Sequence, residues 1–499
     1  MSKTPVIDKI LDAYRPIWAL NHAGGLFEWD LETYMPVDAV KSRGFAQAQL
    51  ALILQQKVLN LTENVSKAEK LDGLNDFEKG IVREIKRALK YYTKIPPELV
   101  EELTRTITEA SVVWREARKR SDFSLFEPYL EKIVQLKRKE ADKLGYEGHP
   151  YNALMDLFEE DLTTGDVDRV FSPLVTALKK LLSRIESSKS FPSSHKLEDV
   201  GYDEESMKRV NREVVRILGM PDKTFRMDVS THPFTSAMSL DDVRITTRYE
   251  GKSFRETIFS VIHECGHALY DLQIDHSLEY TPLAGGPSLG IHESQSRFWE
   301  NFVGRSRDFT NLLYPTLKKN LTFISEYSED DIYKYFNLVR PSLIRVAADE
   351  VTYNFHIVVR YEVEKKLIGG EARVSEIPEI WDDMMEEYIG VRPKNLAEGV
   401  LQDVHWSGGM IGYFPTYSLG NVIAGMVFYR MQRDLNLPDL MARGDISPIK
   451  VWLRENIHKW GSIYSPKELQ KKILGDAYNP EYLVKYLEEK YLAYPSKDS

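Results

Sequence analysis

The 499-residue chain has a single cysteine, no excess of basic residues and no apolar run suited to a membrane span. One cysteine excludes an internal disulfide, which fits a reducing compartment. The net charge of −10 and the pI near 5.7 argue against a general nucleic-acid binder. The longest uncharged run, 404–429, contains five glycines, a proline and several hydroxyls, which indicates a buried wall around polar groups.

The N-terminal segment MSKTPVIDKILDAYRP also lacks the apolar core and the small-residue cleavage site of a signal peptide. We therefore expect a cytoplasmic protein that binds neither nucleic acid nor membrane. The hydrophobic fraction of 42% is sufficient for a large core.

Helical periodicity dominates the sequence. Apolar residues three and four apart recur within 7–20, 76–92, 97–120, 126–145 and 167–185, and Asp166 resembles a cap at the start of the last of these. The polar stretch 187–203 reads as a loop or linker. We expect a mainly α protein forming a single domain over 1–499, with an N-terminal helical part at about 1–200 and a metal-site part at about 225–430.

One region departs from helical spacing. Residues 225–251 alternate in polarity, are rich in β-branched side chains and contain turn signals, so we expect a small antiparallel sheet there. The sheet leads directly into SFRETIFSVIHECGHALYDLQ, whose apolar positions fit a buried helix.

That helix contains the string HECGH. His263 and His267 are four residues apart, so they share one face of a helix and their ring nitrogens can bind one metal ion. Glu264 lies beside them and can accept a proton from a metal-activated water. Gly266 keeps the histidine face thin. Cys265 points about 200° away from His263, and we expect it to be a packing residue.

A hydrolytic metal site needs a third protein ligand. The segment IHESQSRFWEN, 26 residues beyond His267, offers His292 or Glu293, and the helical pattern favours Glu293. The alternative for Glu293 is a surface pair with Arg297, one turn later. Glu300 lies on the same face, and we interpret it as a supporting or salt-bridged residue.

Six short segments, in this order and spacing, resemble the M32 family of metallocarboxypeptidases, the thermostable carboxypeptidase 1 group: HPF (232–234), DVRITT (242–247), HECGH (263–267), HESQSR (292–297), IRVAAD (344–349) and GVLQDVHW (399–406). FEWDLETYMP (27–36) and the segment 146–160 also look like that family. The resemblance covers nearly the whole chain and meets no departure at a proposed metal or catalytic position.

The resemblance implies a large helical peptidase fold with a deep groove. It also implies a cytoplasmic homodimer that removes single residues from peptide C-termini with broad specificity, using zinc or cobalt. Thimet-type oligopeptidases and angiotensin-converting enzyme have similar grooved folds. In those peptidases a histidine and tyrosines stabilise the oxyanion, which favours His405 and Tyr417 here, with Tyr413 as the alternative.

A carboxypeptidase must also bind a free C-terminal carboxylate, for which arginine is well shaped. Arg345 is the first candidate, in a segment (LIRVAADEV) that reads as an apolar helix, and Arg244 is the second. Asp349 could pair with Arg345 or accept a hydrogen bond from a metal-binding histidine.

His232 and the DVRITT strand are expected to line the groove, where an edge strand could pair with the peptide backbone. Gln402 and Asp403 are expected to support the groove.

The predicted reaction is therefore metal-dependent hydrolysis of peptides with free C-termini, with one divalent ion per subunit. Zinc fits two histidines and one glutamate, and cobalt is possible. The alternatives are an endopeptidase on the same scaffold, or an inactive peptide- or partner-binding protein. The presence of Glu264 argues against the inactive protein, because a structural metal site needs no base.

Overall fold

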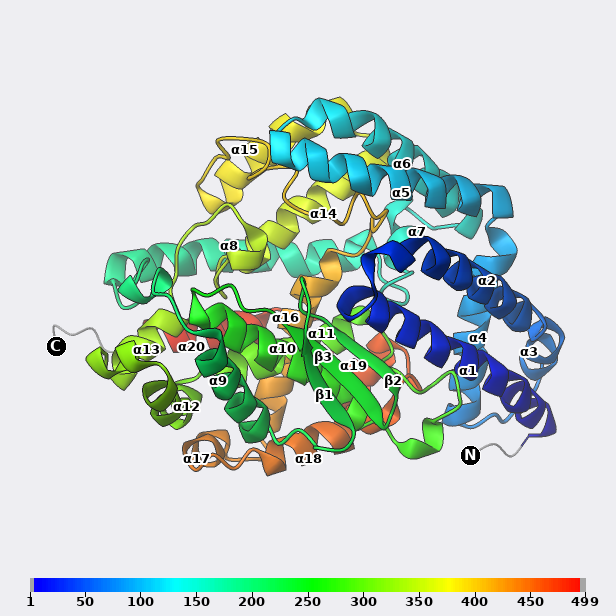
Figure 1. The fold of residues 1–499 in the computed structure, drawn as a ribbon. Helices are drawn as coiled ribbons and strands as arrows, with labels where there is room; N and C mark the ends of the chain where they lie inside the picture. Colours follow the sequence, from blue (N-terminus) through cyan, green and yellow to red (C-terminus); the bar gives the residue numbers. More distant parts are fainter. Residues whose placement is uncertain (1–3, 494–499) are drawn as a thin grey trace. The chain divides into compact units, whose positions relative to one another are not determined.

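The computed structural model describes residues 4–493, which are mainly helical with one small sheet (Figure 1). Over these residues the chain forms two compact units, each assembled from three separate stretches. The first comprises 4–92, 195–336 and 426–477, and the second comprises 93–194, 337–425 and 478–493. The boundary at residue 194 falls within the predicted polar linker. The single domain over 1–499 stays a prediction.

The first unit contains most of the elements that position the HECGH motif. Its helices are α1 (Pro5–Thr33), α2 (Val40–Leu59), α3 (Thr62–Ala68), α4 (Asp76–Lys94), α9 (Glu204–Ile217), α10 (Phe254–Leu272), α11 (Leu289–Arg297), α12 (Arg307–Asn320), α13 (Glu329–Phe336), α17 (Leu437–Ala442), α18 (Ser447–Asn456) and α19 (Pro466–Leu474). Short helical turns lie at Val37–Ala39, Lys196–Glu198, His276–Leu278, Thr322–Glu326 and His458–Trp460, and a π-helix covers Phe298–Gly304.

The second unit is helical apart from its loops. It contains α5 (Pro97–Arg120), α6 (Phe123–Leu144), α7 (Tyr151–Met155), α8 (Thr164–Ser188), α14 (Tyr353–Gly369), α15 (Ile377–Ile389), α16 (Pro415–Met431) and α20 (Glu481–Leu492), with short turns at Arg345–Ala347 and Val374–Glu376. α4 and α16 contain the boundaries at 92 and 425.

The helices predicted at 7–20, 76–92, 97–120, 126–145 and 167–185 are confirmed, and their ends have identifiable causes. α8 begins with a capping box: Thr163 accepts from the backbone of Asp166, and Asp166 accepts from the backbone of Thr163. The cap residue is therefore Thr163, with Asp166 three residues later. The uncharged run at 404–429 is mostly buried, as predicted. No helix in residues 4–493 combines the length and hydropathy of a membrane span.

The sheet has the strand order β1-β3-β2 and is mixed, so the prediction of an antiparallel sheet was wrong. β2 (Thr235–Ser239) and β3 (Asp242–Thr247) form an antiparallel hairpin, but β1 (Phe225–Val229) runs parallel to β3. The reason is topological: the chain reverses after β1, and β3 returns between the two earlier strands. β3 is therefore central, and β2 lies at an edge, next to α1.

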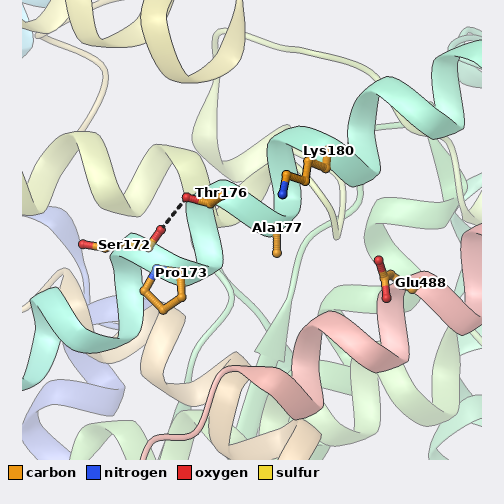
Figure 2. Close-up of a pocket in the computed structure, with 6 residues that line it drawn as sticks. All are labelled: Ser172, Pro173, Thr176, Ala177, Lys180 and Glu488. Atoms are coloured by element: carbon orange, nitrogen blue, oxygen red, sulfur yellow. Dashed lines mark hydrogen bonds between the residues drawn. The ribbon is translucent and has the colours of Figure 1, made fainter.

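The second unit also carries a shallow hollow of about 550 Å³ where α8 faces α20 (Figure 2). Ser172, Pro173, Thr176, Ala177 and Lys180 of α8 line it, with Glu488 of α20 opposite. It contains one lysine and one glutamate and none of the predicted site residues.

Candidate active site

The two motif histidines converge on Glu293. Both lie on α10, most of whose other side chains are buried. Nε2 of His263 lies 3.5 Å and Nε2 of His267 lies 3.4 Å from Oε2 of Glu293. One candidate ligand atom from each residue falls within 4.8 Å of the others. The structure thus brings together the three residues that the sequence predicted as metal ligands.

Gly266 explains how α11 approaches closely enough to bring Glu293 to the histidines. A Cβ at this position would lie 2.6 Å from Cα of Ser296 and 2.8 Å from the carbonyl oxygen of Gln295. Both are backbone atoms, which cannot be moved by a side-chain rotation. The glycine therefore allows α10 and α11 to pack with their backbones in contact, as its place in the motif suggested.

Glu293 faces the histidines with one oxygen and Arg297 with the other. Nε of Arg297 donates to Oε1 over 2.7 Å, and Glu293 is buried. Burial raises the pKa of this carboxyl, but Arg297 and the two histidines outweigh burial and hold the pKa well below its usual range. The Glu293–Arg297 pair exists, but it is a buried pair that orients a carboxylate towards the histidines.

Glu300 fixes the ring of His263. Nδ1 of His263 lies 2.9 Å from Oε2 of Glu300, and Arg297 and Arg305 also donate to that carboxylate. The π-helix Phe298–Gly304 carries Glu300. With its Nδ1 proton donated to Glu300, His263 keeps the lone pair on Nε2 for a metal. The supporting role predicted for Glu300 agrees with these contacts.

His267 is fixed by a relay of two further residues. Its Nδ1 lies 2.6 Å from Nδ1 of His292, whose Nε2 lies 3.0 Å from Oδ1 of Asp271. If His292 donates from Nε2 to Asp271, its Nδ1 accepts the proton of His267, and the Nε2 lone pair of His267 is left for a metal. His292, the alternative third ligand, is therefore a hydrogen-bond partner of His267. Sequence reasoning missed Asp271, although it lies one turn beyond His267.

The charged surroundings act differently on the two histidines. Burial lowers the pKa of His263, but Glu293 and Glu300 outweigh burial and raise it. Burial lowers the pKa of His267, and Glu293 does not compensate fully. A neutral imidazole is the form that binds a metal.

Glu264 points towards the sheet. The hydroxyl of Thr235, the first residue of β2, lies 2.6 Å from Oε2 of Glu264 and 3.0 Å from its carbonyl oxygen. Edge strand β2 therefore starts beside the glutamate that lies between the two motif histidines. Cys265 is fully buried, and burial raises the pKa of its thiol, as expected for a packing residue.

The residues predicted to line the groove have different environments in the first unit. His232 is exposed, and Arg244 donates through Nε and one Nη to the two oxygens of Asp242, over 2.7 Å each. The expectation that DVRITT forms an edge strand was wrong, because this segment is the central strand β3. The edge strand that contacts Glu264 of α10 is β2.

In the second unit, a buried aspartate joins two arginines. Nε of Arg345 lies 2.9 Å from Oδ1 of Asp403, and Nε of Arg360 lies 2.6 Å from Oδ2. Burial raises the pKa of the Asp403 carboxyl, but Arg360 and Arg345 outweigh burial and hold the pKa well below its usual range. Nη1 of Arg345 lies 3.3 Å from the hydroxyl of Tyr353.

The segment around Arg345 is not the apolar helix that was predicted. Only Arg345–Ala347 forms a single 3₁₀ turn, because Asp349 is bound to the backbone N–H groups of Arg340, Val351 and Thr352. Asp349 thus holds the chain turn before α14. It pairs neither with Arg345 nor with a histidine of the metal cluster.

His405 and Tyr417 lie in hydrogen-bond distance, and the Tyr413 ring is also adjacent. Nε2 of His405 is 3.2 Å from the Tyr417 hydroxyl, and the His405 and Tyr413 ring centroids are 5.6 Å apart. Burial lowers the pKa of His405 to about 4, although Asp403 opposes this. His405 is therefore a neutral imidazole at neutral pH, able to donate or accept one hydrogen bond.

Sequence reasoning missed Arg360 and Glu364, which hold this segment in place. Glu364 is fully buried and accepts from Nε1 of Trp406 over 2.8 Å, from the backbone N–H of Gly412 over 2.9 Å, and from the Tyr151 hydroxyl. The signal was available: charged residues within the apolar run FHIVVRYEVEKKL need buried partners. Gln402 accepts from the Arg345 backbone and donates to the Leu343 carbonyl, which agrees with a supporting role.

The donor set of the first unit fits a divalent metal. Two imidazole nitrogens with free lone pairs and one carboxylate oxygen match the usual ligands of a catalytic zinc, and Glu300 and His292 orient the rings. The other candidate group in the described residues, formed by Asp241, His276 and Glu279, is largely exposed and has no comparable support.

Comparisons with known proteins match nearly the whole chain. The family model described as carboxypeptidase Taq (M32) metallopeptidase matches residues 9–491. Thermostable carboxypeptidase 1 of Pyrococcus furiosus is 48% identical over 493 residues, covering 97% of this chain and 98% of the relative. Carboxypeptidase 1 of Bacillus subtilis is 37% identical over 490 residues, covering 97% of each chain.

Solved structures give the same result. A structure of the Pyrococcus furiosus carboxypeptidase has a TM-score of 0.97 at 47% identity, covering 98% of this chain and 99% of that one. The M32 carboxypeptidase from Deinococcus radiodurans has a TM-score of 0.94 at 30% identity, covering 98% and 99%. The fold, the motif order and the family model lead to one conclusion: this chain belongs to the M32 family of metallocarboxypeptidases.

Proposed function

We propose that the protein removes single amino acids from the C-termini of peptides with broad specificity, and that His263, His267 and Glu293 hold its metal. The observation that carries the proposal is the convergence of these three side chains, with donor atoms within 4.8 Å of one another, next to Glu264. Zinc fits this donor set, and cobalt is the alternative. A divalent ion bound there would acidify the attacking water and polarise the scissile carbonyl.

Glu264 acts as the general base in this proposal. It accepts the proton of the attacking water and passes it to the leaving amine. The Thr235 hydroxyl, 2.6 Å from Oε2, holds the carboxylate in one orientation. Thr235 also begins edge strand β2, to which we assign pairing with the substrate backbone. His232, exposed just before this strand, is assigned contact with the peptide.

His405 and Tyr417 are proposed to donate hydrogen bonds to the carbonyl oxygen as it gains negative charge, with Tyr413 as the alternative tyrosine. The neutral state of His405 and its 3.2 Å contact with Tyr417 support this role. Arg345 is proposed to bind the substrate carboxylate, with Arg244 second. Asp403 occupies one edge of the Arg345 guanidinium, whereas Asp242 binds Arg244 with both oxygens.

Hydrolysis of a blocked dipeptide, with and without chelator, tests this function. We expect release of the C-terminal amino acid, its loss on chelation, and its return with zinc or cobalt. Product analysis of a longer peptide distinguishes removal of single residues from internal cleavage, as by an endopeptidase. Absence of release with either metal restored would contradict the proposal and favour an inactive binding protein.

The broad specificity has a physical basis in backbone pairing, which does not select side chains. We also propose a homodimer in the cytoplasm, on the basis of the family resemblance. Light scattering coupled to size-exclusion chromatography measures the mass of the assembly. A mass near the chain's 57.7 kDa would contradict the dimer.

A further inference from the structure

The first unit contains a partly enclosed cavity of about 250 Å³ that the proposed mechanism does not use. One wall is α1, one is the second half of β2, and one is the glycine-rich loop before α11. Its lining residues are Tyr14, Trp18, Asn21, His22, Glu84, Ala237, Met238, Ser239, Leu240, Asp271, Thr281, Pro282, Ala284, Gly285, Gly286 and Ser462.

The cavity follows the proposed catalytic residues along two elements. On β2, Thr235 contacts Glu264, and the cavity begins two residues later at Ala237. On α10, it reaches Asp271, one turn after His267. Each strand residue adds about 3.3 Å, so the cavity lies roughly two to four peptide residues along β2 from the position of Glu264.

Only one side of a substrate extends that far. A carboxypeptidase substrate has a single residue beyond the scissile bond, whereas its N-terminal part can have any length. A peptide paired with β2 therefore reaches the cavity only with residues that precede the scissile bond. His22 donates from Nδ1 to the Met238 carbonyl, which closes the edge beyond this point.

The charge of the cavity selects a type of ligand. Two carboxylates line it, and none of its lining residues is lysine or arginine. One oxygen of Glu84 pairs with Arg83 over 2.6 Å, and one oxygen of Asp271 contacts His292, which leaves one oxygen of each.

Burial and the Glu84 charge raise the pKa of Tyr14 to about 12, so its hydroxyl stays neutral. Trp18 adds an aromatic face, which also attracts cations.

We propose that this cavity is a subsite for a cationic group of the substrate, two to four residues before the scissile bond. The ligand is an ammonium or guanidinium, supplied either by the free amino terminus of a short peptide or by a basic side chain. This inference rests on the proposed carboxypeptidase function and names a preferred substrate class for it.

Four substrates that share one C-terminal dipeptide test the subsite in the metal-loaded enzyme. They are the blocked dipeptide, a tetrapeptide with a free amino terminus, its acetylated form, and an acetylated tetrapeptide with lysine at the first position. We expect kcat/KM to be roughly tenfold higher for a cationic tetrapeptide than for the acetylated neutral one. A preference for the free amino terminus alone identifies that group as the ligand, and a preference for the lysine peptide alone identifies a basic side chain. A preference for both peptides shows that either cation binds. Equal values for all three tetrapeptides would overturn the proposal.

Two variants locate the effect. Glu84→Gln should lower the preference for cations, because Asp271 is then the only carboxylate among the lining residues. Gly285→Leu should lower kcat/KM for every tetrapeptide, because a Cβ at Gly285 meets no atom within 4 Å and the leucine can fill the cavity. Both should hydrolyse the blocked dipeptide at the wild-type rate, and their thermal unfolding should match the wild type. Asp271 is unsuitable for this test because it supports His267.

An undiminished cation preference in Glu84→Gln would overturn the assignment, as would an equal loss on all substrates in folded Gly285→Leu. Failure of the proposed function has a different signature, because the wild type would then not release an amino acid from the blocked dipeptide.

Discussion

The metal cluster and the His405 cluster have opposite electrostatic environments. Around His263, three glutamates outnumber two arginines, and their charges raise the pKa of that histidine. Around His405, two arginines share one aspartate, and the histidine is held neutral by burial. The first environment suits a bound cation, and the second suits negative charge on a carboxylate or an oxyanion. The neighbouring carboxylates thus raise the pKa of His263, whereas burial lowers the pKa of His405.

The largest effect is expected when the proposed base, Glu264, is replaced and the other charged residues around His263 stay unchanged. Glu264→Gln should lower kcat by about 10²–10⁴, because the amide cannot accept the proton of the attacking water. Metal content, measured by elemental analysis, should stay at the wild-type value. Glu256→Gln, in the first turn of the same helix, is the control and should retain activity. Activity of Glu264→Gln above a tenth of wild type would contradict the assignment.

The His405 cluster is tested by replacing Asp403, the aspartate that Arg345 and Arg360 share. Asp403→Asn leaves two buried arginines without their carboxylate and should reduce the free energy of unfolding by about 3–5 kcal/mol. Asp383→Asn removes an exposed partner of Arg392 and should cost less than about 1 kcal/mol. Urea unfolding measures both values. Similar small losses in the two variants would show that the buried ion pairs contribute little.

Variants of the hydrogen-bond relay behind His267 test whether this relay orients the His267 ring for metal binding. His292→Ala should weaken zinc affinity by about 10–100-fold, because the ring of His267 loses its hydrogen-bond partner. Gly286→Ala should weaken it in the same direction, since its Cβ would lie 2.8 Å from the Tyr270 ring and 3.1 Å from His292. Calorimetric titration of the apoprotein with zinc gives the affinity. Wild-type affinity in folded His292→Ala would exclude the orienting role.

The last expected effect is a pH dependence of stability. The folded pKa of His405, about 4, lies below its ordinary value of 6.5, so the unfolded chain binds the proton more readily between these values. The stability that neutral His405 contributes is present above pH 6.5 and is lost as the pH falls towards 4, by up to about 3 kcal/mol. His405→Gln should flatten this part of the unfolding free-energy curve. An unchanged slope in denaturant melts from pH 4 to 7 would contradict the shift.

The convergence of His263, His267 and Glu293 was predictable because its geometry is local. Two histidines on one helical face and a glutamate on the next helix need only helix geometry and one close approach, which Gly266 signals. The sheet topology was not predictable in the same way, because strand order depends on where a returning strand inserts. Likewise, Asp349 breaks the expected helix around Arg345 through hydrogen bonds to the backbone, which periodicity does not register.

The second cluster was predicted only residue by residue. Arg345, His405 and Tyr417 were named from a family pattern, whereas the buried partners Arg360 and Glu364 lie on α14, far from those motifs. Their necessity follows from desolvation, because a buried charge needs a partner, but the sequence does not say which partner is near. Long-range pairing of buried charges is therefore the part that required the structure.

The π-helix at Phe298–Gly304 makes the position of Glu300 sensitive to the number of residues in this segment. An α-helix turns 100° per residue, so deleting one residue between Arg297 and Glu300 would rotate Glu300 and Arg305 away from His263 while Glu293 stayed in place. The three proposed metal ligands would stay in place after such a deletion, but His263 would lose the support of Glu300. In this stretch, tolerance to substitution and tolerance to insertion or deletion are separate properties, and the second is the stricter constraint on how the sequence can diverge.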